Sequence, residues 1–130
     1  MDALLTSQLL INIFEHNTPL HDGAVIVRGN RIVAATCYLP LSDNMELSKQ
    51  LGTRHRAGVG ISEQTDSVTI IVSEETGQVS VAQNGRLIRG VSSAKLREIL
   101  VRAQNKQVVD NSKLRHLLKG RMKHEEEKTH

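Results

Sequence analysis

The sequence predicts a single globular α/β domain, of the α+β kind, in which helices flank a central mixed β-sheet. Three observations predict it: helical spacing of apolar residues in some stretches, short β-branched or aliphatic runs in others, and hairpin-type turns between several of these runs. With 130 residues, the chain is long enough for one hydrophobic core. We place one domain at residues 1–105 and a basic tail, helical in part or disordered, at 106–130.

A helix and a hairpin are expected first. Apolar residues between positions 4 and 14 are spaced as in a helix with one buried side, and the helix should stop before the next proline. Residues 24–27 and 32–39 are apolar runs separated by a Gly-Asn turn, which predicts a β-hairpin. Residues 40–44 are typical of a loop.

The middle of the chain is predicted to contain two helices and a strand. Residues 46–51 have the pattern of a short helix that ends at Gly52, and Thr53 is suited to cap a second helix from Arg54 onward. The β-branched run at 67–73 is typical of a buried strand.

A hairpin and a longer helix complete the predicted domain. Residues 79–82 lead into Asn84-Gly85, a dipeptide that favours a tight hairpin turn. One of two consecutive serines would then cap a helix over residues 94–103, whose apolar positions fall on one face. A weaker amphipathic pattern around residues 114–118 predicts a further helix in the tail.

Composition and charge exclude several function classes. The net charge of +3 comes from the tail, because residues 1–101 carry nine Lys/Arg and ten Asp/Glu whereas residues 102–130 carry eight and four. Without a broad basic face, and with one Phe, one Tyr and no Trp, the chain lacks the footprint of a nucleic-acid-binding protein. No apolar run reaches the roughly 20 residues of a transmembrane helix, and the single Cys37 indicates a packed strand in a reducing compartment. We expect a soluble, cytosolic chain.

Asp22 is the first candidate for chemistry. It lies between a loop and an apolar strand, and Gly23 leaves room for a ligand to approach closely. A carboxylate here could hold a metal ion or accept a proton from a hydroxyl group, and the neighbouring His21 adds an imidazole suited to Mn²⁺ and similar ions. A plain turn with a surface histidine would contain the same residues, so the local sequence leaves both interpretations open.

The second candidate is the segment 52–58, Gly-Thr-Arg-His-Arg-Ala-Gly. It sets two arginines and a hydroxyl group at the expected start of a helix, where free N–H groups and the helix dipole favour anions. Guanidinium groups bind phosphate oxygens in bidentate fashion. Alternatively, Arg54 and Arg56 point into solvent or pair with Glu46, Glu63 or another surface acid. Neither a P-loop nor a dinucleotide fingerprint is present, so a phosphate site would be of another kind.

Two further places could border a ligand. Glu74 and Glu75 follow the buried strand, so one of them could project toward the same cleft as Asp22, or both could belong to a solvated turn. Tyr38 and Leu39 could flank an adenine ring or finish a core strand, and core packing is the default expectation.

Taken together, three segments resemble the motifs of diadenylate cyclase domains: residues 20–24 (Leu-His-Asp-Gly-Ala), 52–56 (Gly-Thr-Arg-His-Arg) and 73–77 (Ser-Glu-Glu-Thr-Gly). The match is specific in order and spacing, and the resemblance extends from about Leu9 to Ala103. The sequence looks most similar to the membrane-anchored cyclases of Gram-positive bacteria.

The resemblance implies that Asp22 assists attack by a ribose 3′-hydroxyl group on the α-phosphate of a second ATP, with release of pyrophosphate, so that two ATP yield cyclic di-AMP. It implies a divalent metal ion, Mn²⁺ or Mg²⁺ with Co²⁺ also suitable, held by His21, Asp22 and Glu75. It also implies a set of substrate-binding residues that contact the phosphates or border the adenine: Gly23, Ala24, Tyr38, Leu39, Gly52, Thr53, Arg54, His55, Arg56 and Ser73.

A homodimer is implied as well, because each ATP must attack the other and the family places two domains face to face. In this family the domain follows several transmembrane helices, and additional strand and helix sequence precedes the position of Leu9. We therefore expect a shortened domain whose parent protein holds it at the cytoplasmic face of the cell membrane. The alternative is a module that binds ATP or cyclic di-AMP without turnover. A lipid-binding or protein-binding role for the tail is disfavoured by its three consecutive glutamates.

Overall fold

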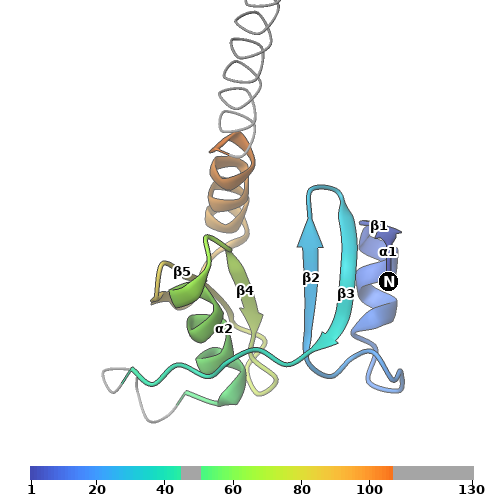
Figure 1. Ribbon diagram of the computed structural model, residues 1–130, viewed down its shortest axis with the longest axis horizontal. Helices are drawn as coiled ribbons and strands as arrows, with labels where there is room; N and C mark the ends of the chain where they lie inside the picture. The colour runs from blue at the N-terminus through green and yellow to red at the C-terminus, as the bar shows by residue number, and fades with distance from the viewer. Residues whose placement is uncertain (45–50, 107–130) are drawn as a thin grey trace, which may run out of the picture.

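The first part of the fold is a three-stranded antiparallel sheet with one short helix. The computed structural model describes residues 1–44 and 51–106. In the first sheet the strand order is β1-β3-β2, with β1 (Ala3–Leu4), β2 (Ala24–Arg28) and β3 (Arg31–Cys37). Helix α1 (Ser7–Ile13) follows β1 (Figure 1). It begins where the Thr6 hydroxyl group accepts a hydrogen bond from Leu9 N at 3.1 Å.

The second part is another three-stranded antiparallel sheet between two helices. Its order is β4-β5-β6, with β4 (Thr69–Val72), β5 (Val79–Gln83) and β6 (Arg86–Ile88). Helix α2 (Thr53–Gln64) precedes this sheet, and residues 93–106 form a helix after it, shown in orange in Figure 1. The β5–β6 turn has positive φ at Asn84 (53°) and Gly85 (77°), as a tight two-residue hairpin turn requires.

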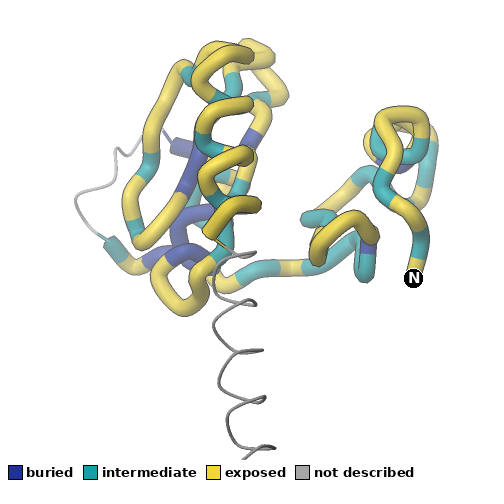
Figure 2. Tube along the Cα trace, turned by 90° about the horizontal axis from the view of Figure 1, so that it is seen from above, coloured by how far each residue is buried: buried dark blue, intermediate teal, exposed yellow. Residues whose placement is uncertain are grey.

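Most of the fully buried side chains lie between α2 and the second sheet. Val59 of α2 packs with Ile71 and Ala82, and the half-buried Leu87 packs against this cluster. Figure 2 shows the buried segments concentrated in this part of the molecule. In the first part, Ile13 and Ile32 are the large apolar side chains that are buried. The start of α2, which carries the second motif, therefore belongs to the better-packed half of the described chain.

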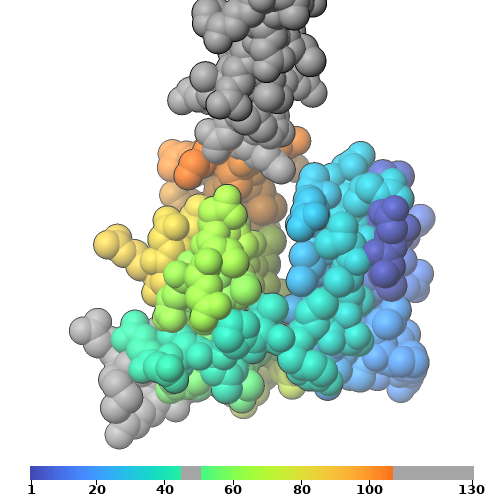
Figure 3. All heavy atoms as spheres, in the orientation of Figure 1, coloured from blue at the N-terminus to red at the C-terminus, as the bar shows by residue number. Residues whose placement is uncertain are grey.

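An extended segment, residues 38–44, connects the two parts across the base of the molecule (Figures 1 and 3). It is held against α2: Ser42 N donates to Arg56 O at 3.0 Å, and the Ser42 hydroxyl group donates to Glu63 at 2.5 Å. Gly60 allows this contact, because a Cβ atom there would lie 1.9 Å from Pro40 O. The segment is thereby fixed along the helix.

The predicted α/β class is confirmed, and so are both hairpins and the helix near residues 94–103, which Ser92 caps by accepting from Lys95 N at 3.2 Å. The single central mixed sheet is wrong for the described residues, whose strands form two antiparallel sheets. The strands of the second sheet follow one another closely, as do β2 and β3, but β1 pairs with β3 across α1. The connection after β3 leads along α2 and does not add a strand to the first sheet. Sequence patterns locate strands but do not say which strands pair across a long connection.

Several predicted boundaries are corrected. The first helix is shorter than residues 4–14, because Leu4 belongs to β1 and helical residues start at Ser7. Thr53 is not the cap of α2 but its first residue, with Gly52 at the N-cap and no side-chain capping bond. The strand expected at 67–73 is limited to β4. Leu51 is not helical, and the rest of the predicted helix 46–51 lies outside the described residues, as do 107–130 of the predicted tail.

None of the helices among residues 1–44 and 51–106 combines the length and the apolar character that a bilayer crossing requires.

Candidate functional site

The loop that carries Asp22 is held in place by a glycine next to a neighbouring strand. Gly23 has φ +83°, and a Cβ atom there would lie 2.9 Å from Cys37 O at the end of β3. Opposite Gly23, Thr36 also has a positive φ of 53°, which is uncommon for a β-branched residue. The close approach at Gly23 therefore fixes the position of Asp22 relative to the hairpin.

In the loop just before β2, Asp22 is exposed and His21 is half-buried. One carboxylate oxygen of Asp22 accepts from Gly23 N at 3.1 Å, which leaves the other oxygen available to a ligand. His21 Nδ1 lies 2.7 Å from Thr18 O, which can only accept, so Nδ1 carries the proton and Nε2 is free to accept a hydrogen bond or bind a metal ion. Local contacts thus orient both groups for chemistry.

Tyr38 does not pack in the core. Its residue is 84% exposed, and β3 ends one residue earlier, at Cys37. The default expectation of core packing is therefore wrong for Tyr38, because the chain leaves the sheet before the ring can be covered. Leu39 beside it is half-buried. An exposed ring on a well-fixed segment is available to stack on a ligand.

The arginine at the start of α2 connects the second motif to the third. Arg54 donates through one nitrogen to Val72 O at 2.7 Å and through another to the Glu74 carboxylate, with which it forms an ion pair. Of the alternatives left open by the sequence, pairing with a surface acid is the one found for Arg54. The contact nevertheless places the helix start directly beside the end of β4. The two predicted phosphate-binding segments therefore meet at one end of the second sheet.

The pKa of His55 departs from its ordinary value. Burial, and then the positive charges of Arg89 and Arg54, lower the pKa of His55 below 6.5. The charges of Arg89 and Arg54, together with the uncapped N-terminus of α2, make the environment of His55 locally positive. It is the kind of place where an anion is stabilised.

The turn after β4 presents the third motif. Ser73 closes it: Ser73 N donates to Gln78 O at 3.0 Å, Gly77 N donates to Ser73 O at 2.9 Å, and the Ser73 hydroxyl group accepts from Thr76 N at 3.3 Å. Glu74 is engaged by Arg54, and Glu75 beside it is exposed. Glu75 is thus the carboxylate of this turn that is left to meet a metal ion or ligand.

The structure brings together the second and third motifs but not the first. Within residues 1–44 and 51–106, no hydrogen bond or ion pair joins the loop 20–24 to the start of α2 or to the turn 73–77. Nor do three His, Cys, Asp or Glu side chains of this part of the chain gather as a metal site. The donor types of His21, Asp22 and Glu75 suit Mn²⁺ or Mg²⁺, but these three side chains do not lie together within one copy of the chain.

Two features of the site were missed in the sequence. Arg89, which lies beyond the end of β6, lowers the pKa of His55. No sequence motif indicated Arg89, because its position near His55 depends on strand pairing. The Ser42–Glu63 contact, which fixes the segment after Leu39, joins residues 21 positions apart. A serine after a proline loop carries no local signal for such a partner.

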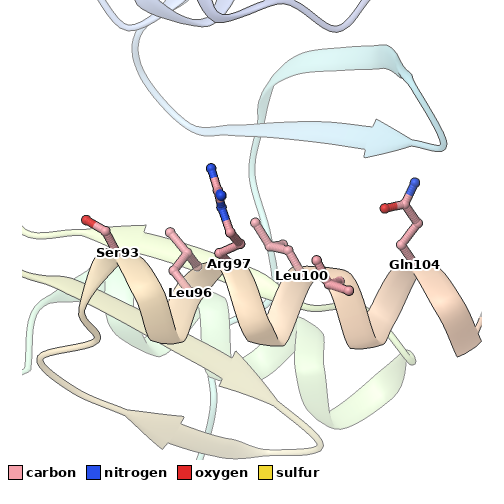
Figure 4. A pocket seen from close by; sticks show the side chains of 6 residues that line it. Ser93, Leu96, Arg97, Leu100 and Gln104 are labelled. Carbon is pink, nitrogen blue, oxygen red and sulfur yellow. The ribbon is translucent and has the colours of Figure 1, made fainter.

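An open pocket elsewhere does not contribute to the motifs. Its volume is about 290 Å³. Figure 4 shows its labelled side chains projecting from one side of the helix at 93–106. The lining residues are Ser93, Leu96, Arg97, Leu100, Val101 and Gln104.

Comparison with known proteins adds a family match. Residues 1–87 match the family model described as "DAC: DisA bacterial checkpoint controller nucleotide-binding". Cyclic di-AMP synthase CdaA of Bacillus subtilis is 58% identical over 121 residues, which are 93% of this chain and 44% of that protein. The chain thus spans less than half the length of this curated relative.

Two solved structures are similar in fold. A crystal structure of a double mutant of DacA from Staphylococcus aureus has a TM-score of 0.76 and 54% identity, and the match covers 78% of this chain and 68% of that one. A hypothetical membrane spanning protein from Bacillus cereus has a TM-score of 0.69 and 49% identity, and the match covers 71% and 45% of the two chains.

Proposed function

Because this chain belongs to the family of DAC nucleotide-binding domains, we propose that it is the catalytic domain of a diadenylate cyclase, which condenses two ATP into cyclic di-AMP and two pyrophosphates. The observation that carries the proposal is the Arg54 contact with the end of β4. It sets a guanidinium group, the free N–H groups of a helix start and the Ser73 turn side by side, a combination suited to a nucleoside triphosphate. The name of the Bacillus subtilis relative supports the product.

The proposed reaction is a nucleotidyl transfer. The 3′-oxygen of one ATP forms a bond to the α-phosphorus of the other, the bond from that phosphorus to the bridging oxygen breaks, and pyrophosphate leaves. Asp22, exposed and with a free carboxylate oxygen, accepts the 3′-hydroxyl proton or orients that hydroxyl group. Thr53, Arg54 and Ser73 hold the phosphates, and Tyr38 and Leu39 border the adenine. Positioning and neutralisation of negative charge supply most of the rate in such transfers.

A divalent metal ion is part of the proposal. His21 Nε2, Asp22 and Glu75 are donors of the types that Mn²⁺ and Mg²⁺ accept, and Co²⁺ would suit the imidazole as well. When bound with ATP, such an ion would neutralise phosphate charge. Because these three side chains do not lie together within one copy, they would meet only around bound nucleotide or at a contact between copies.

The site is proposed to be completed by a second copy of the chain. The Asp22 loop and the phosphate-binding end of the second sheet lie on different parts of one copy, and no hydrogen bond or ion pair among the described residues joins them. Two copies facing each other would offer the Asp22 of one to the nucleotide held by the other. The neighbour described as membrane spanning supports a further proposal, that the domain works at the cytoplasmic face of a membrane within a longer protein.

The test is Asp22→Ala, followed by mass spectrometry of product from ATP and Mn²⁺ and by calorimetric ATP binding. We expect turnover to fall by a factor of about 10² or more with binding changed only a few-fold. Arg54→Ala should instead weaken ATP binding itself. Full turnover by Asp22→Ala would overturn the assignment. ATP binding without any cyclic di-AMP from the wild-type chain would favour a non-catalytic nucleotide-binding module, which the separation of the two motifs in one copy also permits.

A further inference from the structure

The register of β6, continued one residue past its end at Ile88, puts Arg89 on the sheet face that α2 covers. Thr69 pairs with Ala82, and Ala82 pairs with Leu87, so these three side chains share one face. Because side chains alternate along a strand, the residue two positions after Leu87 returns to that face. That residue is Arg89, and Val91 N still donates to Val79 O at 2.8 Å just beyond it, so the chain continues along β5.

The same end of the sheet holds the start of α2. Near the C-terminal end of the helix, the Ser62 hydroxyl group accepts from Gly85 N at 3.0 Å, in the turn that precedes β6. At the other end of the helix, Arg54 reaches Val72 O. The helix therefore runs antiparallel to β6, and Arg89, past the far end of β6, comes next to the helix start. The effect of Arg89 on the pKa of His55 agrees with this placement.

Arg89 is a cation without a partner in the described part of the chain. It is exposed and makes no hydrogen bond or ion pair with any residue in 1–44 or 51–106. The charge of Arg54, by contrast, is already balanced by Glu74. A guanidinium group beside His55 and the positive end of a helix adds to the local positive potential, which an anion bound there would offset. Phosphate is the anion best suited to it, because two phosphate oxygens can accept the parallel N–H bonds of a guanidinium group.

We propose that Arg89 is an additional phosphate-binding residue of this site, and that it contacts the phosphate tail and so favours a nucleoside triphosphate over a monophosphate. This inference rests on the proposed nucleotide-binding function. Arg89 adds positive charge to that of Arg54, whose guanidinium group also ties the helix to β4 and Glu74. The long, exposed side chain can reach a ligand without any change in the backbone.

Binding of α,β-methylene-ATP and of AMP to the full chain tests the proposal. With Arg89→Ala, the dissociation constant for the ATP analogue should rise about tenfold, as expected for loss of one charge-assisted contact. AMP binding should change less than about twofold. Arg89→Lys should recover part of the lost affinity, because lysine keeps the positive charge but cannot donate two parallel hydrogen bonds as a guanidinium group does.

Arg86→Ala is the matched control. Arg86 is a nearby exposed arginine, but it pairs with Gln83 at the other end of β6 and on the opposite face. Equal analogue binding by Arg89→Ala and Arg86→Ala, with product still formed by the wild type, would overturn the role of Arg89 and leave the proposed function intact. Equal losses for AMP and the analogue would overturn the triphosphate preference. A wild-type chain that binds neither ligand would remove the proposed function and this inference with it.

Discussion

Gly23 occupies a position that a larger residue can fill only by moving β3. Its φ of +83° disfavours any side chain, and a Cβ atom would also meet Cys37 O and the Thr36 carbonyl carbon, each at 2.9 Å. We expect Gly23→Ala to cost about 2–4 kcal/mol of unfolding free energy, from backbone strain and overpacking together. Urea unfolding followed by circular dichroism measures this loss.

Gly29 provides the control for that measurement. It also has a positive φ, +61°, but nothing lies within 4 Å of its Cβ position. Gly29→Ala should therefore show the backbone cost alone, about 1–2 kcal/mol. Equal losses for the two variants would mean that contact with β3 does not constrain the Asp22 loop.

His55 gives the stability of the chain a pH dependence. Its pKa is lowered in the folded state by burial and by Arg89 and Arg54, so below about pH 6.5 the unfolded chain binds a proton at this ring that the folded chain does not. The unfolding free energy should therefore fall as the pH drops through the window below 6.5, until the lowered pKa is passed. Urea unfolding from about pH 7.5 to 5.5 should show a steeper fall for the wild type than for His55→Gln. Identical slopes would contradict this.

At single residues, the sequence indicated candidate groups but not their environment. The residue types at 20–24, 52–56 and 73–77 predicted phosphate-binding and metal-binding groups, and these roles stay predictions. Their partners were not predictable, because Arg54 meets Val72 and Glu74 only once α2 packs on β4. The exposure of Tyr38 depends on where β3 ends, and Arg89 depends on strand register, neither of which a local pattern contains.

Among the elements, α2 depends on a close approach at Gly60. A Cβ atom there would lie 1.9 Å from Pro40 O and 2.9 Å from Ser42 N, both backbone atoms of the connecting segment. Alanine improves helix propensity by about 1 kcal/mol, yet we expect Gly60→Ala to destabilise the protein by about 1–3 kcal/mol because the segment must move. Thermal unfolding measures the net effect, and faster amide exchange at Ser42, which donates to Arg56 O, would locate it.

Gly58 is the comparison within the same helix. A Cβ atom there would meet the side chain of Ile71, with 2.8 Å to Cδ1, rather than backbone. A side chain can rotate where a backbone carbonyl cannot, so Gly58→Ala should cost less than Gly60→Ala. The reverse order would show that the connecting segment is not held tightly on α2.

Element prediction succeeded where a local pattern was decisive. The Asn84-Gly85 turn needs two positive φ angles, which this dipeptide adopts readily, and the structure has them. The start of the first helix was placed too early because Leu4 fits an apolar helix face as well as it fits β1, whose pairing with β3 joins residues far apart in sequence. The division of the strands into two sheets also depends on pairing between strands, which the sequence pattern does not contain.

For the whole molecule, exposed apolar side chains are the feature that bears on assembly. Ile26 and Val27 of β2, Ile70 and Val72 of β4 and Leu100 after β6 are each between 39% and 47% exposed. Exposed apolar residues on several elements are typical of surfaces used in association when they form contiguous patches. The proposed pairing of two copies would gain free energy if it covered such side chains.

A mixing experiment tests whether two copies share one reaction centre. If each Asp22 acts on a nucleotide held by the other copy, a mixed pair of wild-type and Asp22→Ala chains cannot close both bonds of the cyclic product. Equal amounts of the two chains, allowed to exchange, should then roughly halve the cyclic di-AMP formed per wild-type chain, because pairing is random and symmetric. Adding Arg86→Ala chains instead should cause no such loss. Output per wild-type chain that is unchanged at every ratio of Asp22→Ala would mean that a single copy contains the complete centre.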